Sequence, residues 1–182
     1  MKKSNALLIT TCGIFTALLC ILAPISVPIG PIPISLSGLV IYLSIYVIGM
    51  KKSLISYVVY LLLGLVGLPV FSGYQGGLAK IAGPTGGYLV GYILVIVIGG
   101  IVYEKVNGKA KIPATIVAMM VGTVVCYAFG TAWFVFQMDC ELSYALGVCV
   151  YPFIPFDCGK IAIATLLGVP VRKTLAKQGL VD

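Results

Sequence analysis

The chain has 182 residues, of which 60% are hydrophobic and 9% are charged, and its net charge is +7. A soluble domain carries about a quarter charged residues, so this composition excludes a soluble protein and predicts a single integral membrane domain, residues 1–182. Nucleic acid is excluded as a partner, because binding it requires a soluble basic face. The chain has six cysteines without a CxxC spacing and no histidine, which argues against a zinc or other transition-metal site.

Six apolar runs predict an all-α bundle of six transmembrane helices, since a spanning helix needs roughly 20 apolar residues. The first run is interpreted as a span rather than a secretory signal, because it lacks a small-residue cleavage site and further apolar runs follow it. A shorter apolar stretch, LSYALGVCV (142–150), is too short to span and predicts an interfacial helix. The predicted spans are 6–23, 34–49, 54–68, 84–103, 113–136 and 155–169.

The placement of basic residues predicts a multi-pass protein of the cell membrane with both termini in the cytoplasm. Of the 12 lysines and arginines, Lys80 falls in an outer loop and Lys160 in the sixth predicted span. The other ten fall at the inner side, where they can also contact anionic membrane lipids. These ten are Lys2, Lys3, Lys51, Lys52, Lys105, Lys109, Lys111, Arg172, Lys173 and Lys177.

Two outer loops are rich in proline and glycine and carry little charge. They are PISVPIGPIP (24–33) and PVFSGYQGGLAKIAGPTGGY (69–88). Glycine lets the backbone bend sharply and approach a ligand closely. Non-helical backbone near membrane depth is tolerated only where it is buried in protein or lines a cavity. The two loops therefore predict a ligand cavity that opens to the outside.

The segment PFIPFDCGK (152–160) places Asp157 and Lys160 three residues apart, on one face of a helix. Pro155 suits the first helical turn, and Asp157 then lies near the positive end of the helix dipole. Each charge costs about 2.5–3.5 kcal/mol at mid-membrane on insertion scales. The pair fits either a helix cap with an outward-pointing lysine or a ligand site, and intramembrane ionisable residues favour the ligand site.

The loop SGYQGG (72–77) offers the ring of Tyr74 as a stacking surface and the amide of Gln75 as a hydrogen-bonding group. An ordinary turn fits the same residues equally well. The phosphate-loop pattern GxxxxGK[ST] does not occur in the chain, so nucleotide binding is not supported.

Small residues four positions apart on two predicted spans allow helices to pack closely. Gly87 and Gly91 are assigned to packing inside the bundle. Gly13 and Ala17 fit either packing inside the bundle or contact with a separate membrane partner.

Three aromatic residues lie toward the outer end of the fifth predicted span. Such residues commonly form an interfacial belt, and the alternative is the wall of an apolar pocket. They are Tyr127, Trp133 and Phe134.

Five segments together resemble the BioY family, the biotin-specific S components of energy-coupling factor (ECF) transporters. The resemblance implies a six-helix S component that binds biotin in an outward-facing pocket and carries no cofactor. It further implies delivery of biotin with a transmembrane coupling protein and two cytosolic ATPases. The segments are IGPIPISLSGL (29–39), GLPVFSGYQGG (67–77), GPTGGYLVGY (83–92), GTAWF (130–134) and PFIPFDCGK (152–160).

The resemblance places the acid and the lysine of the family's sixth helix on Asp157 and Lys160, and its first-helix AxxxA contact on Gly13 and Ala17. We expect Asp157 to accept the ureido N–H groups of biotin and Lys160 to donate to the ureido carbonyl or the carboxylate. Further candidate ligand contacts are Gln75, Tyr74, Tyr88 and Lys80, the last near the carboxylate.

The chain departs from the family pattern at two positions. Phe156 precedes the acid where the family usually has glycine, and Ser37 stands where the first loop commonly has glutamine. The two departures concern the entry into the sixth helix before Asp157 and the polar contact that the resemblance implies for the first outer loop.

Three other functions compete with an S component. An enzyme is disfavoured, because without histidine the common acid–base and Ser–His designs are not available. An autonomous secondary transporter of biotin or a small carboxylate, with Asp157 as a proton-coupling group, remains the main alternative. The third is a structural membrane subunit in which the polar pair only fixes packing.

Overall fold

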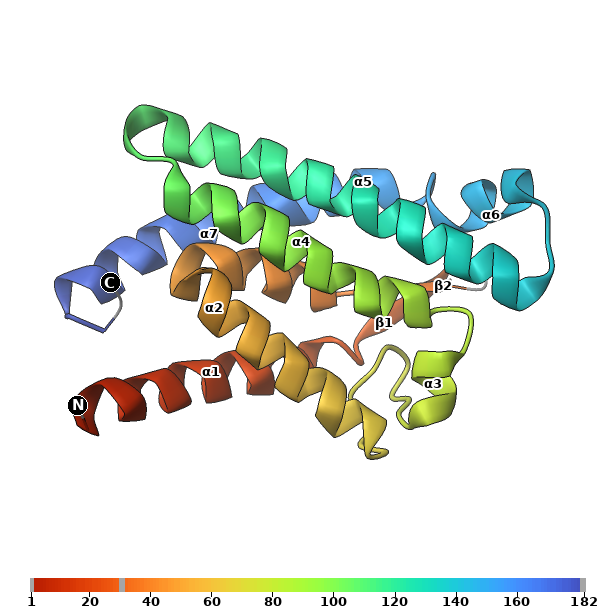
Figure 1. Ribbon diagram of the computed structural model, residues 1–182, viewed down its shortest axis with the longest axis horizontal. Coiled ribbons are helices and arrows are strands. Elements are labelled where there is room, and N and C mark those ends of the chain that lie inside the picture. The colour runs from red at the N-terminus through yellow and green to blue at the C-terminus, as the bar shows by residue number, and fades with distance from the viewer. Residues whose placement is uncertain (1, 30–31, 181–182) are drawn as a thin grey trace.

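The computed structural model describes residues 2–29 and 32–180, so the tip of the predicted loop 24–33 lies outside the described residues. The long helices run roughly along the longest axis of the molecule, and both termini lie at the same end (Figure 1). The elements in chain order are α1 (Lys2–Leu22), β1 (Ser26–Ile29), β2 (Ile32–Ser35), α2 (Ser37–Leu65), α3 (Leu78–Ala82), α4 (Gly86–Lys105), η1 (Gly108–Ala110), α5 (Lys111–Met138), α6 (Leu142–Cys149) and α7 (Phe153–Lys177).

Helix α2 breaks at Gly49, whose backbone adopts φ 76° and ψ 176°. This conformation strains any residue with a Cβ atom, which is why glycine stands there. The two halves of α2, orange and yellow in Figure 1, run in different directions from the end nearest the termini. They correspond to the segments 34–49 and 54–68 that the sequence predicted as separate spans.

Two side chains from other helices satisfy backbone groups at the break in α2. Glu104 Oε1 accepts the N–H of Met50 at 2.9 Å, and Arg172 Nη1 donates to the carbonyl of Val47 at 3.0 Å. Helix ends leave such groups without partners inside the helix. The second half of α2 therefore begins at once after Gly49, with Lys51 and Lys52 inside it rather than in a loop.

The proline-rich segment before α2 forms an antiparallel β-hairpin, in which Val27 pairs with Ile34 and Pro28 with Pro33. Proline is excluded from helix interiors but tolerated in short edge strands. The side chains of Ile32 and Ile34 are buried. Because Ile32–Ser35 is a strand, α2 begins at Ser37, three residues later than the predicted span.

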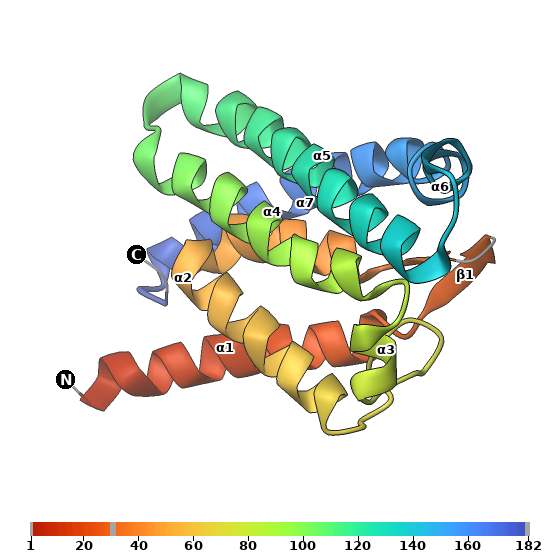
Figure 2. The same ribbon diagram turned by 45° about the vertical axis from the view of Figure 1, so that its right-hand side comes forward.

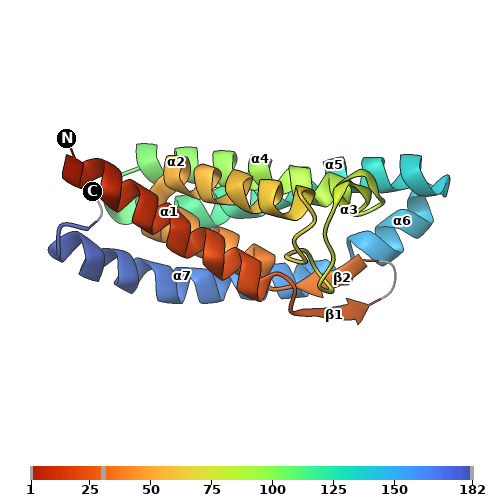
Figure 3. The same ribbon diagram turned by 90° about the horizontal axis from the view of Figure 1, so that it is seen from below.

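Helix α7 continues past Pro170 to Lys177, whereas the predicted sixth span ended at residue 169. Proline removes one N–H and distorts the helix locally, but the preceding and following turns stay helical here. Helix α6 occupies the stretch that the sequence assigned to a short interfacial helix. The hairpin, α3 and α6 gather at the end of the molecule opposite the termini (Figure 3).

Helices α4 and α5 lie side by side along their length (Figures 1 and 2). Glycines make this close approach possible. A Cβ atom at Gly87 would lie 2.4 Å from Trp133 Cβ, and one at Gly91 would lie 2.8 Å from Cys126 Sγ. The prediction that Gly87 and Gly91 pack inside the bundle is therefore confirmed.

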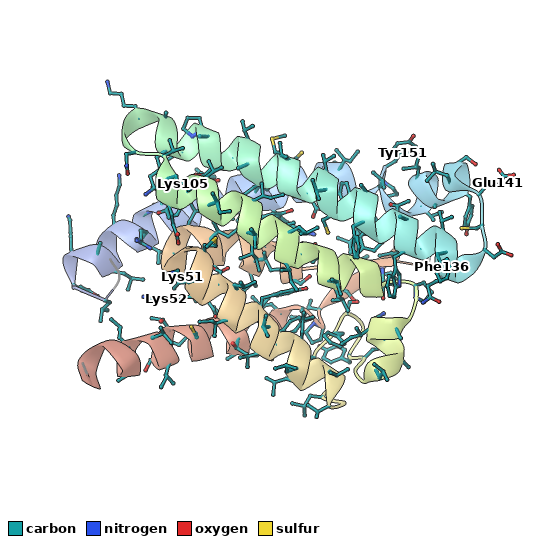
Figure 4. The ribbon with its side chains drawn as sticks, viewed as in Figure 1. Lys51, Lys52, Lys105, Phe136, Glu141 and Tyr151 are labelled. Carbon is teal, nitrogen blue, oxygen red and sulfur yellow. The ribbon has the colours of Figure 1, made fainter. Side chains whose placement is uncertain are left out.

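Within residues 2–29 and 32–180, four helical stretches are long and apolar enough to cross a membrane, while the apolar part of α1, Ala6–Leu22, is shorter. The molecule has one basic end, where Lys51, Lys52 and Lys105 lie near the termini (Figure 4). Phe136, Glu141 and Tyr151 lie toward the opposite end, which the hairpin, α3 and α6 form.

Candidate functional site

A cavity of ≈ 670 Å³, counted with its open mouth, lies at the end formed by the hairpin and α3. Side chains from the hairpin, α3, α4, α5 and α7 meet around it. The polar members include Ser35, Lys80, Tyr88, Tyr127, Asp157 and Lys160.

The first two turns of α7 place Asp157 and Lys160 in the cavity wall, where they are 4% and 8% exposed. Lys160 Nζ donates to Asp157 Oδ1 at 2.8 Å, and Tyr127 Oη donates to Asp157 Oδ2 at 2.5 Å. An ionised carboxylate offers about four acceptor positions. Asp157 therefore keeps acceptor capacity for the donors of a ligand while its charge is balanced by Lys160.

Gly38 of α2 lies beside the Lys160 side chain and leaves room for the hydroxyl of Tyr92. A Cβ atom there would lie 3.0 Å from Tyr92 Oη and 3.7 Å from Lys160 Nζ. One turn further along α2, Tyr42 Oη and Thr123 Oγ1 of α5 hydrogen-bond at 2.7 Å. The charged pair is thus surrounded by hydroxyl groups from α2, α4 and α5.

The mouth of the cavity contains Lys80 from α3 and Tyr88 from α4. Tyr88 Oη and Thr131 Oγ1 hydrogen-bond at 2.8 Å, which fixes the ring against α5. Burial lowers the pKa of the Lys80 ammonium below its ordinary value, because desolvation disfavours the charged form. An anionic group at the mouth would stabilise that charge.

Tyr74 and Gln75 lie outside the cavity, although the sequence predicted them as ligand contacts. Tyr74 is 67% exposed, and Gln75 lines a separate depression beside Lys80. The aromatic residue of this loop that turns inward is Phe71, whose ring packs against Gly64 and is fully buried.

Gly13 and Ala17 are exposed on α1, in an apolar groove against the second half of α2. Ile55 and Val59 form the facing side of this groove. The groove lies on a different face from the ligand cavity, so these two residues do not belong to the ligand site.

The two departures from the family pattern differ in their position. Ser37 lines the cavity, and its hydroxyl lies 2.6 Å from that of Ser35. Phe156 is 48% exposed and does not line the cavity. Its side chain therefore does not block a ligand in the cavity from reaching Asp157.

Tyr127 is the polar contact of Asp157 that sequence reasoning did not assign to the ligand site. A buried tyrosine hydroxyl usually finds a hydrogen-bond partner, and Asp157 was the one carboxylate predicted at the outer end of a span. A tyrosine and a carboxylate, both near the outer ends of predicted spans, were therefore the sequence features from which this contact could have been predicted.

Trp133 and Phe134 do not form an interfacial aromatic belt. Trp133 donates to the carbonyl of Gly83 at 3.0 Å, and Phe134 is fully buried.

The helical bundle and its end-on cavity with a buried ion pair define a membrane protein of the S-component class. The structure is similar to the crystal structure of the S-component for biotin from an ECF-type ABC transporter, with a TM-score of 0.86 and 28% sequence identity. The match covers 95% of this chain and 94% of that one.

The family model described as the BioY family matches residues 1–177, and the chain belongs to this family. It is 39% identical to the biotin transporter BioY of Thermotoga maritima over 161 residues, which are 88% of this chain and 93% of that protein. It is 35% identical to the probable biotin transporter BioY of Pyrococcus horikoshii over 155 residues, covering 85% and 90%.

Proposed function

We propose that the chain is the biotin-binding S component of an ECF-type importer. The buried Asp157–Lys160 pair in the wall of an end-on cavity carries this proposal. Biotin has a ureido group with two N–H donors and one carbonyl, an apolar ring and chain, and a carboxylate. A cavity with a few convergent polar groups among apolar walls suits such a molecule.

In this proposal the ureido group faces the charged pair. The remaining acceptor positions of Asp157 receive its N–H groups, and Lys160 donates to its carbonyl. The carboxylate then lies near Lys80 at the mouth, and Tyr88 contacts the apolar chain. Tyr74 and Gln75 have no ligand contact in this proposal, because both lie outside the cavity.

Transport requires partners in this proposal. A transmembrane coupling protein docks on the exposed Gly13–Ala17 face of α1, because small residues let helices approach closely. Two cytosolic ATPases supply the energy. The basic end with both termini faces the cytoplasm of the cell membrane, and the cavity opens to the outside.

Biotin should raise the melting temperature of the purified protein, because a ligand at 100 times its Kd adds about 2.7 kcal/mol of stability. Desthiobiotin, which keeps the ureido group, should also stabilise the protein. Lipoate, which has a carboxylate and a sulfur ring but lacks N–H donors, should not. Equal shifts with biotin and lipoate would contradict the assignment of Asp157 to the ureido group.

Biotin affinity should fall as the pH rises in the alkaline range, beginning below the ordinary titration range of lysine. Lys80 pairs with the carboxylate only while it is protonated, and burial lowers its pKa. Raising the pH through that pKa therefore removes the attraction. Calorimetric titration at several pH values checks this.

Lys80→Met is the matched variant for this pH series, and it should bind biotin more weakly with a flat alkaline profile. The methyl ester of biotin should show little pH dependence with either protein. An unchanged alkaline profile in Lys80→Met would mean that another group titrates, and the position assigned to the carboxylate would be wrong.

A further inference from the structure

A second concavity lies on the other side of the charged pair. It is an apolar groove of ≈ 1150 Å³, counted with its open side, between α5, α6 and α7. Val124, Leu142 and Ile154 line it and are 64%, 58% and 45% exposed. Exposed apolar side chains along spanning helices contact membrane acyl chains, so this groove faces lipid.

Three residues line both the ligand cavity and the lipid-facing groove: Thr123, Tyr127 and Asp157. The wall between the two spaces is therefore one side chain thick at this place. Thr123 is held by Tyr42 from α2 and by the carbonyl of Met119 in its own helix. Tyr127 bridges the gap between α5 and α7, because its hydroxyl donates to Asp157.

We propose that Tyr127 is a positioning residue that also closes the ligand cavity toward the membrane. The hydroxyl fixes one oxygen of Asp157, so the carboxylate presents its free acceptor positions to the cavity. The ring fills the space through which an acyl chain would otherwise enter the ligand cavity and reach Lys160, which lines the cavity and not the groove. The positioning role rests on the proposed function, whereas the closure does not require a ligand.

The wall at Tyr127 separates the charged ligand cavity from the acyl chains of the membrane. Hydrocarbon inside the cavity would lie against the ammonium of Lys160 and leave its charge poorly solvated, which is costly in a membrane. An acyl chain inside the cavity would also occupy the space that the ligand needs. A side chain that is apolar along its ring and polar at its tip satisfies both sides of the wall.

The two roles can be separated by two substitutions. Tyr127→Phe keeps the ring and removes the hydroxyl, so it should weaken biotin binding about tenfold while the wall stays closed, because a hydrogen bond to a charged group is lost. Tyr127→Ala removes the ring as well and should open the wall. Tyr151→Phe, an exposed tyrosine near the start of α7, should leave affinity unchanged.

Closure is measured with a phosphatidylcholine that carries a diazirine near the end of one acyl chain, in vesicles without biotin. After illumination, mass spectrometry locates the labelled residues. The wild-type protein should be labelled at Val124 and Ile154 in the groove and remain unlabelled at Cys126 and Phe153, which line the cavity alone. Tyr127→Ala should gain label at Cys126 and Phe153, and Tyr127→Phe should not.

Absence of cavity label in Tyr127→Ala would overturn the closure, and unchanged affinity in Tyr127→Phe would overturn the positioning role. If Tyr127→Ala does not fold, judged by its melting curve, Tyr127→Ser with the same lipid probe takes its place. A wild-type protein that fails to bind biotin would refute the proposed function, while the labelling pattern without biotin would still decide the closure.

Discussion

Lys160→Met should lower the free energy of unfolding by about 3–5 kcal/mol and abolish measurable biotin binding. The substitution leaves the carboxylate of Asp157 buried without its cationic partner, and breaking a buried pair from one side costs about that much. Tyr127 would still donate one hydrogen bond, which does not balance the charge. Denaturant or thermal unfolding in detergent gives the stability, and calorimetry gives the binding.

The double variant Asp157→Asn with Lys160→Met separates stability from function. It removes both charges, so most of the lost stability should return, because replacing a whole buried pair is far less costly than breaking it. Biotin binding should stay absent. Lys173→Met, an exposed lysine of the same helix, is the matched control and should change neither. Equal destabilisation by the single and double variants would contradict this account.

Gly87→Ala should destabilise the protein by about 1–3 kcal/mol, the usual cost of overpacking. The added methyl group would lie 2.4 Å from Trp133 Cβ, close to the backbone of α5, where little movement is possible. Displacing Trp133 would also weaken its hydrogen bond to Gly83 in the segment that connects α3 to α4. Because α3 carries Lys80, we expect biotin affinity to fall together with stability.

The control for Gly87→Ala is Gly159→Ala in α7. Among the described residues, nothing lies within 4 Å of a Cβ atom built at Gly159. Alanine should therefore be neutral there or stabilise the helix by about 0.5–1 kcal/mol, since glycine is the poorer helix former. If both variants lost the same stability, close packing of α4 on α5 would not be the reason.

The sequence predicts well what depends on short stretches of chain. Apolar runs located the helical segments, and the spacing of Asp157 and Lys160 placed both on one face near the start of α7. The small-residue spacing at Gly87 predicted close helix contact. Each of these inferences needs only the helical period and the cost of charge in an apolar medium.

Features that depend on distant residues were not predictable in this way. The two halves of α2 are joined at Gly49 without a longer loop, because Glu104 and Arg172 from two other helices hydrogen-bond the backbone groups at the break. Phe71 turns inward in preference to Tyr74 because Gly64 leaves room for its ring. These outcomes follow from contacts between segments, which the spacing of one segment does not contain.

The β-hairpin at the mouth pairs Pro28 with Pro33, and this has a consequence for solubility and assembly. A strand edge normally offers a row of N–H groups on which another chain can add a strand and begin aggregation. Proline has no N–H, so it interrupts that row in both strands at the same level. The hairpin can therefore stand at an exposed opening without recruiting a third strand from a neighbouring molecule.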